Sequence, residues 1–197
     1  TSGCLLRGNA LQNVAAYLDP SLIAVSTGEE MHGISQSDGA TLWTNEVDRV
    51  IDAAAFSPCG QFLFVVDSIA APPGAGDERE SFDRAWRVKK LNADTGSELL
   101  SWVANLDVRL LADEYEDIEI ACSPDGTSIA YYVESDYGGE VGCVCASSGA
   151  SSWAGHTLEA HADEPELSHG SRLTLAFADR DTIVLWDCRK GFARGRI

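Results

Sequence analysis

Short apolar runs alternate with polar turns along the chain. The runs are rich in β-branched and aromatic residues and are bounded by Gly, Pro, Asp or Ser, which is typical of β-strands. The clearest runs cover residues 22–26, 51–56, 62–66, 86–91, 99–103, 118–122, 129–133 and 141–146. No segment shows a sustained helical period. The sequence therefore predicts an all-β protein.

The final stretch, residues 173–191, shows the pattern most clearly. An apolar run ends at the polar cluster 179–181, and a second, β-branched run ends in Trp186-Asp187 before a glycine turn. Two strands around a tight turn are predicted here, and residues 192–197 supply one more outer strand. The two strands around the turn form the second half of a four-stranded unit.

Two kinds of turn repeat along the chain. One lies between apolar runs, at residues 18–21, 56–60, 122–126 and 168–171, and the other closes each unit, at 37–39, 94–96, 147–149 and 189–191. Their spacing is at or above the roughly 40–50 residues of a four-stranded repeat, with one long outlier. The predicted units are 13–48, 49–109, 110–155 and 156–197, preceded by an N-terminal segment, 1–12.

The long second unit contains an insertion at residues 70–84. Two prolines, two glycines and six charged residues make this segment unsuitable for packing into a sheet. We expect a surface loop, either disordered or functional. If the loop has a role, Phe82 is the side chain that would anchor it.

The turns at 56–60 and 122–126 resemble the Phe-Ser-Pro-Asp-Gly turn of WD-repeat propellers. Gly155-His156 and Trp186-Asp187 resemble the Gly-His and Trp-Asp pairs that begin and end such a repeat. The resemblance implies a hydrogen-bonded network within the last blade, formed by His156, Trp186 and either Asp179 or Asp181. The serine of that network falls on Ala176, so the network is incomplete.

The blade endings resemble a second family, the quinoprotein-like propellers. Gly39 with Trp43, Gly96 with Trp102, and Gly149 with Trp153 follow its Gly-x-x-x-Trp pattern, with a longer spacing in the second pair. The resemblance implies glycines in left-handed turn positions and tryptophans that cover the space between neighbouring blades. An ordinary core role would bury the same tryptophans.

The expected fold is thus an all-β propeller of about four four-stranded antiparallel blades, forming an incomplete arc. Each bare end face would expose about 500 Å² of apolar surface, which costs roughly 12 kcal/mol at about 25 cal/mol per Å². A patch of that size marks an interface. We expect the arc to be completed by further chain, by a second copy in a homodimer, or by a partner.

The net charge of the chain excludes some classes of binding partner. The formal net charge is −17, from 31 acidic and 14 basic residues. Such a field repels phosphate backbones, so no nucleic-acid partner is expected and a basic protein is favoured. No apolar run is long enough to span a membrane, and no membrane partner is expected.

The densest charge cluster is the acidic run at 113–119, placed on the connection between the second and third units. Its docking candidates are Asp113, Glu114, Tyr115, Glu116 and Asp117. A solvated loop is one interpretation, and a docking patch for a basic partner or a divalent cation is the other. The spacing lacks the Asp-x-Asp-x-Asp-Gly pattern of a calcium loop.

Candidate chemistry is sparse. The six cysteines form no Cys-x-x-Cys pair and are predicted to be small apolar core residues in a reducing compartment, cytoplasm or nucleus. His156, His161 and His169 have no standard metal-ligand spacing, and no nucleophile motif is present. We therefore expect no metal, no cofactor and no catalytic residue.

Two classes of function follow. The first is a non-catalytic scaffold for protein–protein interaction, which docks a protein or peptide on the propeller rim. The alternative is a propeller enzyme domain, quinoprotein-like or metal-dependent, with its site in the central channel. Fold alone does not decide between them.

Overall fold

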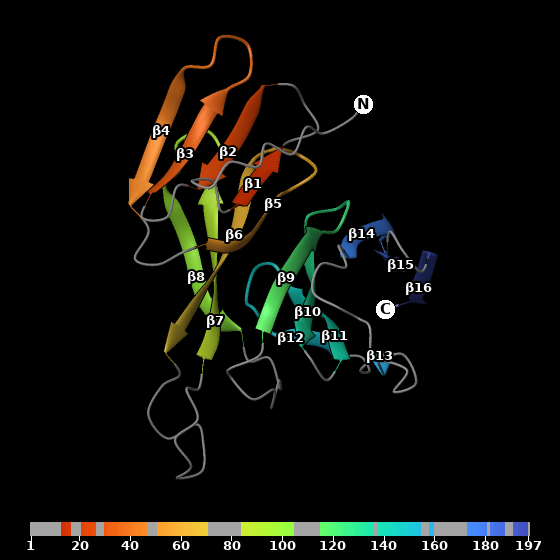
Figure 1. Ribbon diagram of the computed structural model, residues 1–197. Helices are drawn as coiled ribbons and strands as arrows, with labels where there is room; N and C mark the ends of the chain where they lie inside the picture. Colours follow the sequence, from red (N-terminus) through yellow and green to blue (C-terminus); the bar gives the residue numbers. More distant parts are fainter. Residues whose placement is uncertain are drawn as a thin grey trace. The chain divides into compact units, whose positions relative to one another are not determined.

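A computed structural model describes residues 13–16, 21–26, 30–46, 51–70, 84–104, 115–135, 138–154, 158–159, 173–180, 182–187 and 191–196. These residues form sixteen strands and no helix (Figure 1). No helix in this part of the chain is long and apolar enough to cross a membrane. The expected all-β class is confirmed.

The strands fall into two compact units, β1–β8 and β9–β16. The N-terminal unit contains two four-stranded antiparallel sheets, each in chain order. The first sheet is made of β1 (Asn13–Ala16), β2 (Leu22–Ser26), β3 (Glu30–Ser35) and β4 (Thr41–Glu46). The second is made of β5 (Ile51–Phe56), β6 (Phe62–Ala70), β7 (Arg84–Asn92) and β8 (Glu98–Ala104).

The C-terminal unit also contains two antiparallel sheets. The third sheet is made of β9 (Tyr115–Cys122), β10 (Ser128–Ser135), β11 (Gly138–Cys145) and β12 (Ser151–Ala154), with the short β13 (Leu158–Glu159) also pairing with β11. The fourth has three described strands, β14 (Leu173–Asp179), β15 (Thr182–Asp187) and β16 (Gly191–Arg196).

The pairing of β6 with β7 corrects the predicted bounds of the insertion. The ladder continues to the pair formed by Ala70 and Arg84, so both end residues of the expected loop belong to strands. The ladder's hydrogen bonds outweigh the weak strand propensity of these two ends. Phe82 and the rest of segment 71–83 lie outside the described residues.

The closing turns of the first three sheets share one backbone geometry. In each, the residue that opens the turn accepts a hydrogen bond from the glycine N–H: Ser35 from Gly39 at 2.9 Å, Asn92 from Gly96 at 2.8 Å and Cys145 from Gly149 at 2.8 Å. These three glycines have φ between 69° and 73°. The left-handed turn positions expected of them are confirmed, and a side chain there would be strained.

In the N-terminal unit, the core lies between the two sheets. Trp43 of β4 is 7% exposed and belongs to a cluster with Met31 of the first sheet and Leu63 and Leu91 of the second. Its indole N–H donates to the backbone carbonyl of Ala93, in the turn after β7, at 2.8 Å. Trp43 therefore covers the space between neighbouring sheets, as expected.

The Trp43 ring fits between two glycines. A methyl group on Gly33, its cross-strand partner on β3, or on Gly96 would overlap the indole. The ring needs both positions free of side chains. Of the other tryptophans in this series, Trp102 is half-buried and the side chain of Trp153 lies outside the described part.

The C-terminal unit repeats this arrangement with different residues. Its core joins Tyr132 and Cys143 of the third sheet to Leu175 and Ile183 of the fourth. Burial of such apolar side chains is worth about 1.5–3 kcal/mol each. Each unit is thus a pair of sheets that share one core.

Candidate functional site

The predicted docking run is placed differently from the expectation. Strand β9 begins at Tyr115, so Tyr115, Glu116 and Asp117 belong to the first strand of the third sheet and not to a connection. Tyr115 pairs with Ser135 of β10 and Ile118 with Val133, and the register shifts between these two pairs. The strand therefore continues through Glu116 and Asp117 despite the low strand propensity of acidic residues. Asp113 and Glu114 lie outside the described residues.

Along β9 the acidic run ends in an alternating pattern. Ile118 and Ile120 are buried, whereas Glu119 between them is exposed. This alternation is what a strand with one buried face requires. The exposed carboxylate of Glu119 is therefore carried by a strand that the sheet holds in place.

The predicted blade network lies largely beyond the described part. His156 and Asp181 fall outside it, and so does the side chain of Trp186. The backbone of Trp186 pairs with Thr174 and Phe192 in the fourth sheet. Asp179, the last residue of β14, is exposed. The network stays a prediction.

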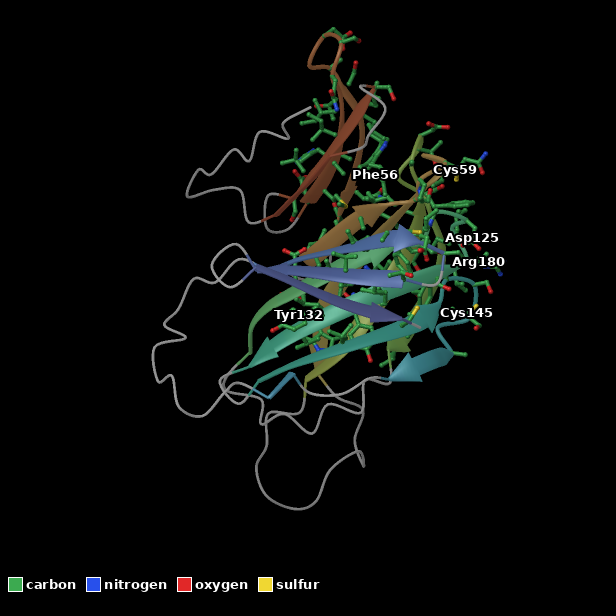
Figure 2. The ribbon with its side chains drawn as sticks, turned by 90° about the vertical axis from the view of Figure 1, so that its right-hand side faces the viewer. Phe56, Cys59, Asp125, Tyr132, Cys145 and Arg180 are labelled. Atoms are coloured by element: carbon green, nitrogen blue, oxygen red, sulfur yellow. The ribbon has the colours of Figure 1, made fainter. Side chains whose placement is uncertain are left out.

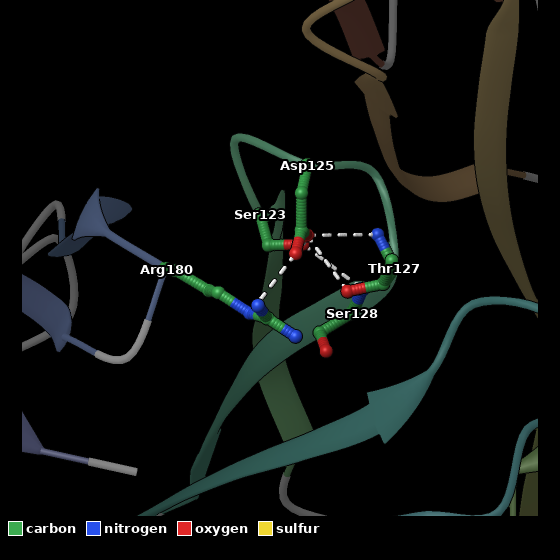
Figure 3. Close-up of polar contacts among 5 residues, drawn as sticks. All are labelled: Ser123, Asp125, Thr127, Ser128 and Arg180. Carbon is green, nitrogen blue, oxygen red and sulfur yellow. Dashed lines mark hydrogen bonds and ion pairs between the residues drawn. The ribbon is translucent and has the colours of Figure 1, made fainter.

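The turn between β9 and β10 contains a connected set of polar side-chain contacts (Figure 3). The buried Ser123 hydroxyl donates to the Asp125 carboxylate at 2.7 Å and accepts from the Ser128 N–H at 2.9 Å. Thr127 donates to the same carboxylate through its hydroxyl, at 2.7 Å, and through its N–H, at 3.1 Å. Such hydrogen bonds between residues of one turn stabilise its tight conformation.

These donors determine the protonation of Asp125. Hydrogen bonds from Thr127 and Ser123 lower the pKa of Asp125 to about 2, because they stabilise the charged form. Arg180, in the turn after β14, places its Nε 3.1 Å from the carboxylate (Figure 3). The Arg180 side chain is 74% exposed, so the ion pair contributes little to stability.

The turn between β5 and β6 has the same geometry with a thiol in place of the carboxylate. The Ser57 hydroxyl accepts from the Phe62 N–H at 3.0 Å and lies 3.3 Å from the Cys59 sulfur. Hydrogen bonds with Ser57 and with the backbone of Gln61 lower the pKa of Cys59. Cys59 thus occupies the position that Asp125 holds in the other turn.

A second thiol, that of Cys145, contacts a serine in the turn that follows β11. The Cys145 sulfur lies 3.1 Å from the Ser147 hydroxyl, and hydrogen bonds with Ser147 and Ser148 lower its pKa to about 7. Asn92 occupies the same position in the second sheet, where its side-chain oxygen accepts from Thr95. Figure 2 shows Cys145 and Asp125 at the same end of the strands, with Tyr132 farther along the sheet.

The cysteine prediction is therefore wrong in part. Cys143 is buried, as expected, but Cys59 is exposed and Cys145 is half-buried. The sequence signal was available, because both thiols stand where turn residues with oxygen acceptors stand in the sister repeats. Among the described residues no group of three His, Cys, Asp or Glu side chains could hold a metal ion.

Exposed apolar side chains gather on the last strand of each sheet in the N-terminal unit. Leu99, Leu100 and Val103 of β8 are 51%, 38% and 50% exposed, and Leu42 of β4 is 55% exposed. Within the described residues, these are the large apolar side chains that face solvent. Sequence reasoning predicted these strands but did not identify their exposed face.

A comparison with known proteins addresses the fold. A solved structure of a protein provisionally designated TolB, from Agrobacterium tumefaciens, covers 94% of this chain with a TM-score of 0.52. The fold is a β-propeller. The expected fold class is confirmed, and each sheet is a propeller blade. Sequence identity to that structure is 17%, and the chain spans 58% of its length. No protein-family model and no curated protein sequence matches the chain.

Proposed function

We propose that this propeller is a non-catalytic scaffold of the WD-repeat type that docks a basic protein or peptide on its rim. The observation that carries the proposal is the outer strand β8, which presents Leu99, Leu100 and Val103 to solvent. Apolar side chains gathered on an exposed edge are a common feature of docking surfaces. A partner with apolar side chains would bury them.

Charge supports a basic partner. A net charge of −17 attracts positively charged segments and accelerates their encounter. The run Asp113–Asp117 concentrates this charge, and its last three residues belong to the paired strand β9. We propose this run as a docking site for a basic segment, in addition to the apolar strand β8 of the N-terminal unit.

The test is binding of a synthetic amphipathic peptide that alternates lysine with leucine, measured by fluorescence anisotropy at two salt concentrations. A variant with Asp113→Asn, Glu114→Gln, Glu116→Gln and Asp117→Asn should bind at least about tenfold more weakly, because four attractive charges are lost. A second variant, Leu99→Ser with Val103→Ser, should also bind more weakly, with an unchanged salt dependence.

The control removes the same charge elsewhere, through Asp77→Asn, Glu78→Gln, Glu80→Gln and Asp83→Asn. This variant should keep nearly all of the affinity. Equal weakening in both four-charge variants would assign binding to the overall field and would contradict a docking patch. If the Leu99→Ser, Val103→Ser variant binds the peptide as tightly as the natural sequence, the apolar side chains of β8 do not take part in docking.

A second proposal concerns how the incomplete arc of blades is closed. We propose that the blades are completed by further chain, by a second copy, or by the partner itself. Light scattering measures the molar mass directly, and a value near twice 21.1 kDa supports the homodimer. A monodisperse monomer with no exposed apolar surface would contradict completion by a second copy.

The enzyme alternative, with a site in the central channel, has a separate test. Metal analysis and an absorbance scan of the purified protein would detect a bound metal or quinone. A stoichiometric amount of either would favour the enzyme over the scaffold.

A further inference from the structure

A cavity of about 190 Å³ lies inside the N-terminal unit, between β4 and the second sheet. It is smaller than the roughly 300–1,000 Å³ of pockets for drug-sized ligands, so its size suits a short aliphatic molecule. The described residues that line it come from β4 to β8: Asn45, Glu46, Ile51, Val65, Asp67, Lys89, Leu91 and Glu98.

The two sides of the cavity are held together by hydrogen bonds between the first two sheets. The Asn45 side-chain amide donates to the backbone carbonyl of Gly96. Trp43, on the same strand, donates to the carbonyl of Ala93 at 2.8 Å. Both acceptors lie in the turn that joins β7 to β8. The cavity is therefore formed before a ligand enters, which lowers the entropic cost of binding.

One wall of the cavity is apolar. Ile51, Val65 and Leu91 come from β5, β6 and β7 and are between 1% and 4% exposed. All three belong to the core cluster that contains Trp43. A short alkyl group of a ligand would leave water to contact this wall, and such a transfer is favourable.

The charged groups of the lining are mostly acidic. Among the described lining residues, one cation, Lys89, stands against the carboxylates of Glu46, Asp67 and Glu98. Asp67 is 4% exposed and lies 3.7 Å from the Lys89 ammonium. It also accepts hydrogen bonds from Arg87, which does not line the cavity. Asp67 is thus already paired with cations of the protein, and the negative charge that remains in the lining belongs to the two glutamates.

These two glutamates lie where the cavity meets solvent. Glu46, at the end of β4, and Glu98, at the start of β8, are both exposed. No described side chain forms an ion pair with either carboxylate. A carboxylate accepts its strongest hydrogen bonds from a charged donor, so the opening favours the cationic group of a ligand.

We propose that this cavity binds a short aliphatic ammonium, with its alkyl group against the apolar wall and its ammonium at Glu46 and Glu98. Buried apolar side chains at depth and two carboxylates at the opening match the two ends of such a molecule. The ammonium belongs either to a free amine or to the first residue of a peptide with an aliphatic side chain. The site does not rest on the docking surfaces proposed above, so either proposal can fail without the other.

Four small probes test the proposal by NMR titration of the isotope-labelled protein. Isoamylamine, isoamyl alcohol and isocaproate share one alkyl group and carry a positive, no and a negative charge. Isoamylamine should bind at least about tenfold more tightly than the other two, because only its ammonium donates charge-assisted hydrogen bonds to the glutamates. Methylamine keeps the ammonium without the alkyl group and should also bind at least about tenfold more weakly than isoamylamine.

Two further probes identify the source of the ammonium. Leucinamide carries the free amino group and the side chain of a peptide's first residue, and N-acetyl-leucinamide lacks the charge. Leucinamide that binds as tightly as isoamylamine, with loss of binding on acetylation, supports the peptide. Isoamylamine that binds at least about tenfold more tightly than leucinamide supports the free amine.

A double variant, Glu46→Gln with Glu98→Gln, tests the role of the two carboxylates. It should weaken isoamylamine at least about tenfold and leave isoamyl alcohol unchanged. The fold should be unaffected, since both side chains are exposed. The matched control, Asp38→Asn with Asp94→Asn, removes two exposed carboxylates of the same unit that do not line the cavity, and it should leave isoamylamine binding unchanged.

Three results would overturn the proposal. One is equal affinity for isoamylamine and isoamyl alcohol, or for isoamylamine and methylamine, because one end of the ligand would then contribute nothing. Another is equal weakening of isoamylamine in the glutamate variant and in its control, which would indicate attraction by the overall charge of the protein. The third is the absence of any shift change with isoamylamine at millimolar concentration.

Discussion

Trp43 and Ala93 are fifty residues apart in sequence, yet the indole N–H of one donates to the backbone carbonyl of the other at 2.8 Å. Ala93 is fully buried, so this hydrogen bond has no competition from water. It joins the last strand of the first blade to a turn of the second. Trp43→Phe keeps an aromatic ring but leaves the carbonyl without its donor, which should cost about 1–3 kcal/mol of unfolding free energy.

Urea denaturation monitored by circular dichroism measures this loss. Leu42→Ala provides the matched control, because Leu42 is the neighbouring residue on β4 and is 55% exposed. It should change the midpoint little. A Trp43→Phe variant as stable as the natural sequence would show that the hydrogen bond contributes nothing to the packing of the two blades.

A second aromatic side chain covers a glycine in the C-terminal unit. Tyr131 of β10 pairs with Gly142 of β11, and a methyl group on Gly142 would overlap the Tyr131 ring. Gly142→Ala should therefore destabilise the protein by about 1–3 kcal/mol through overpacking. In the background of Tyr131→Ala, the same change should cost much less. A double-mutant cycle in urea measures this coupling, and additive effects would contradict the contact.

Lowering the pH should destabilise the turn between β9 and β10, because it protonates Asp125. Because the folded-state pKa of Asp125 is lowered from 3.8 to about 2, its ionised form stabilises the native state above pH 4, and this contribution is lost as the pH falls towards 2. Asp125→Asn should reduce stability at neutral pH, and the difference from the natural protein should shrink between pH 4 and 2. A difference that is constant with pH would contradict the assignment. Thermal unfolding at several pH values provides the measurement.

The thiol of Cys145 should react at lower pH than an ordinary cysteine. With its pKa lowered to about 7, about half of it is thiolate at neutral pH, whereas a free cysteine reaches that point near pH 8.5. Alkylation by iodoacetamide, followed by peptide mass spectrometry, should show a half-maximal rate near pH 7. Ser147→Ala removes the hydroxyl that lies 3.1 Å from the Cys145 sulfur and should raise that midpoint. An unchanged midpoint in this variant would contradict the role of Ser147.

Local patterns predicted most of the strands. The runs 22–26 and 51–56 coincide with β2 and β5, and the turn glycines Gly39, Gly96 and Gly149 have the expected left-handed conformation. These features depend on short-range chemistry: β-branched residues favour strands, and glycine tolerates positive φ. Sequence alone is sufficient for them.

Features that depend on cross-strand pairing were not predictable. Strand β1, Asn13–Ala16, is only four residues long, and the acidic start of β9 has low strand propensity. Both exist because a neighbouring strand supplies hydrogen bonds. The approach of Arg87 to Asp67 likewise follows from the register of β6 with β7, which composition does not reveal.

The paired turns at Ser57 and Ser123 also give the two units different sensitivities. The two turns have equivalent hydrogen bonds from a serine, but the equivalent position is the thiol of Cys59 in the N-terminal unit and the carboxylate of Asp125 in the C-terminal unit. Alkylating reagents and oxidants therefore modify this turn in the first unit and leave its counterpart intact, whereas strong acid neutralises only the counterpart. At these two turns, thiol reagents and strong acid therefore act on different residues, Cys59 in the first and Asp125 in the second.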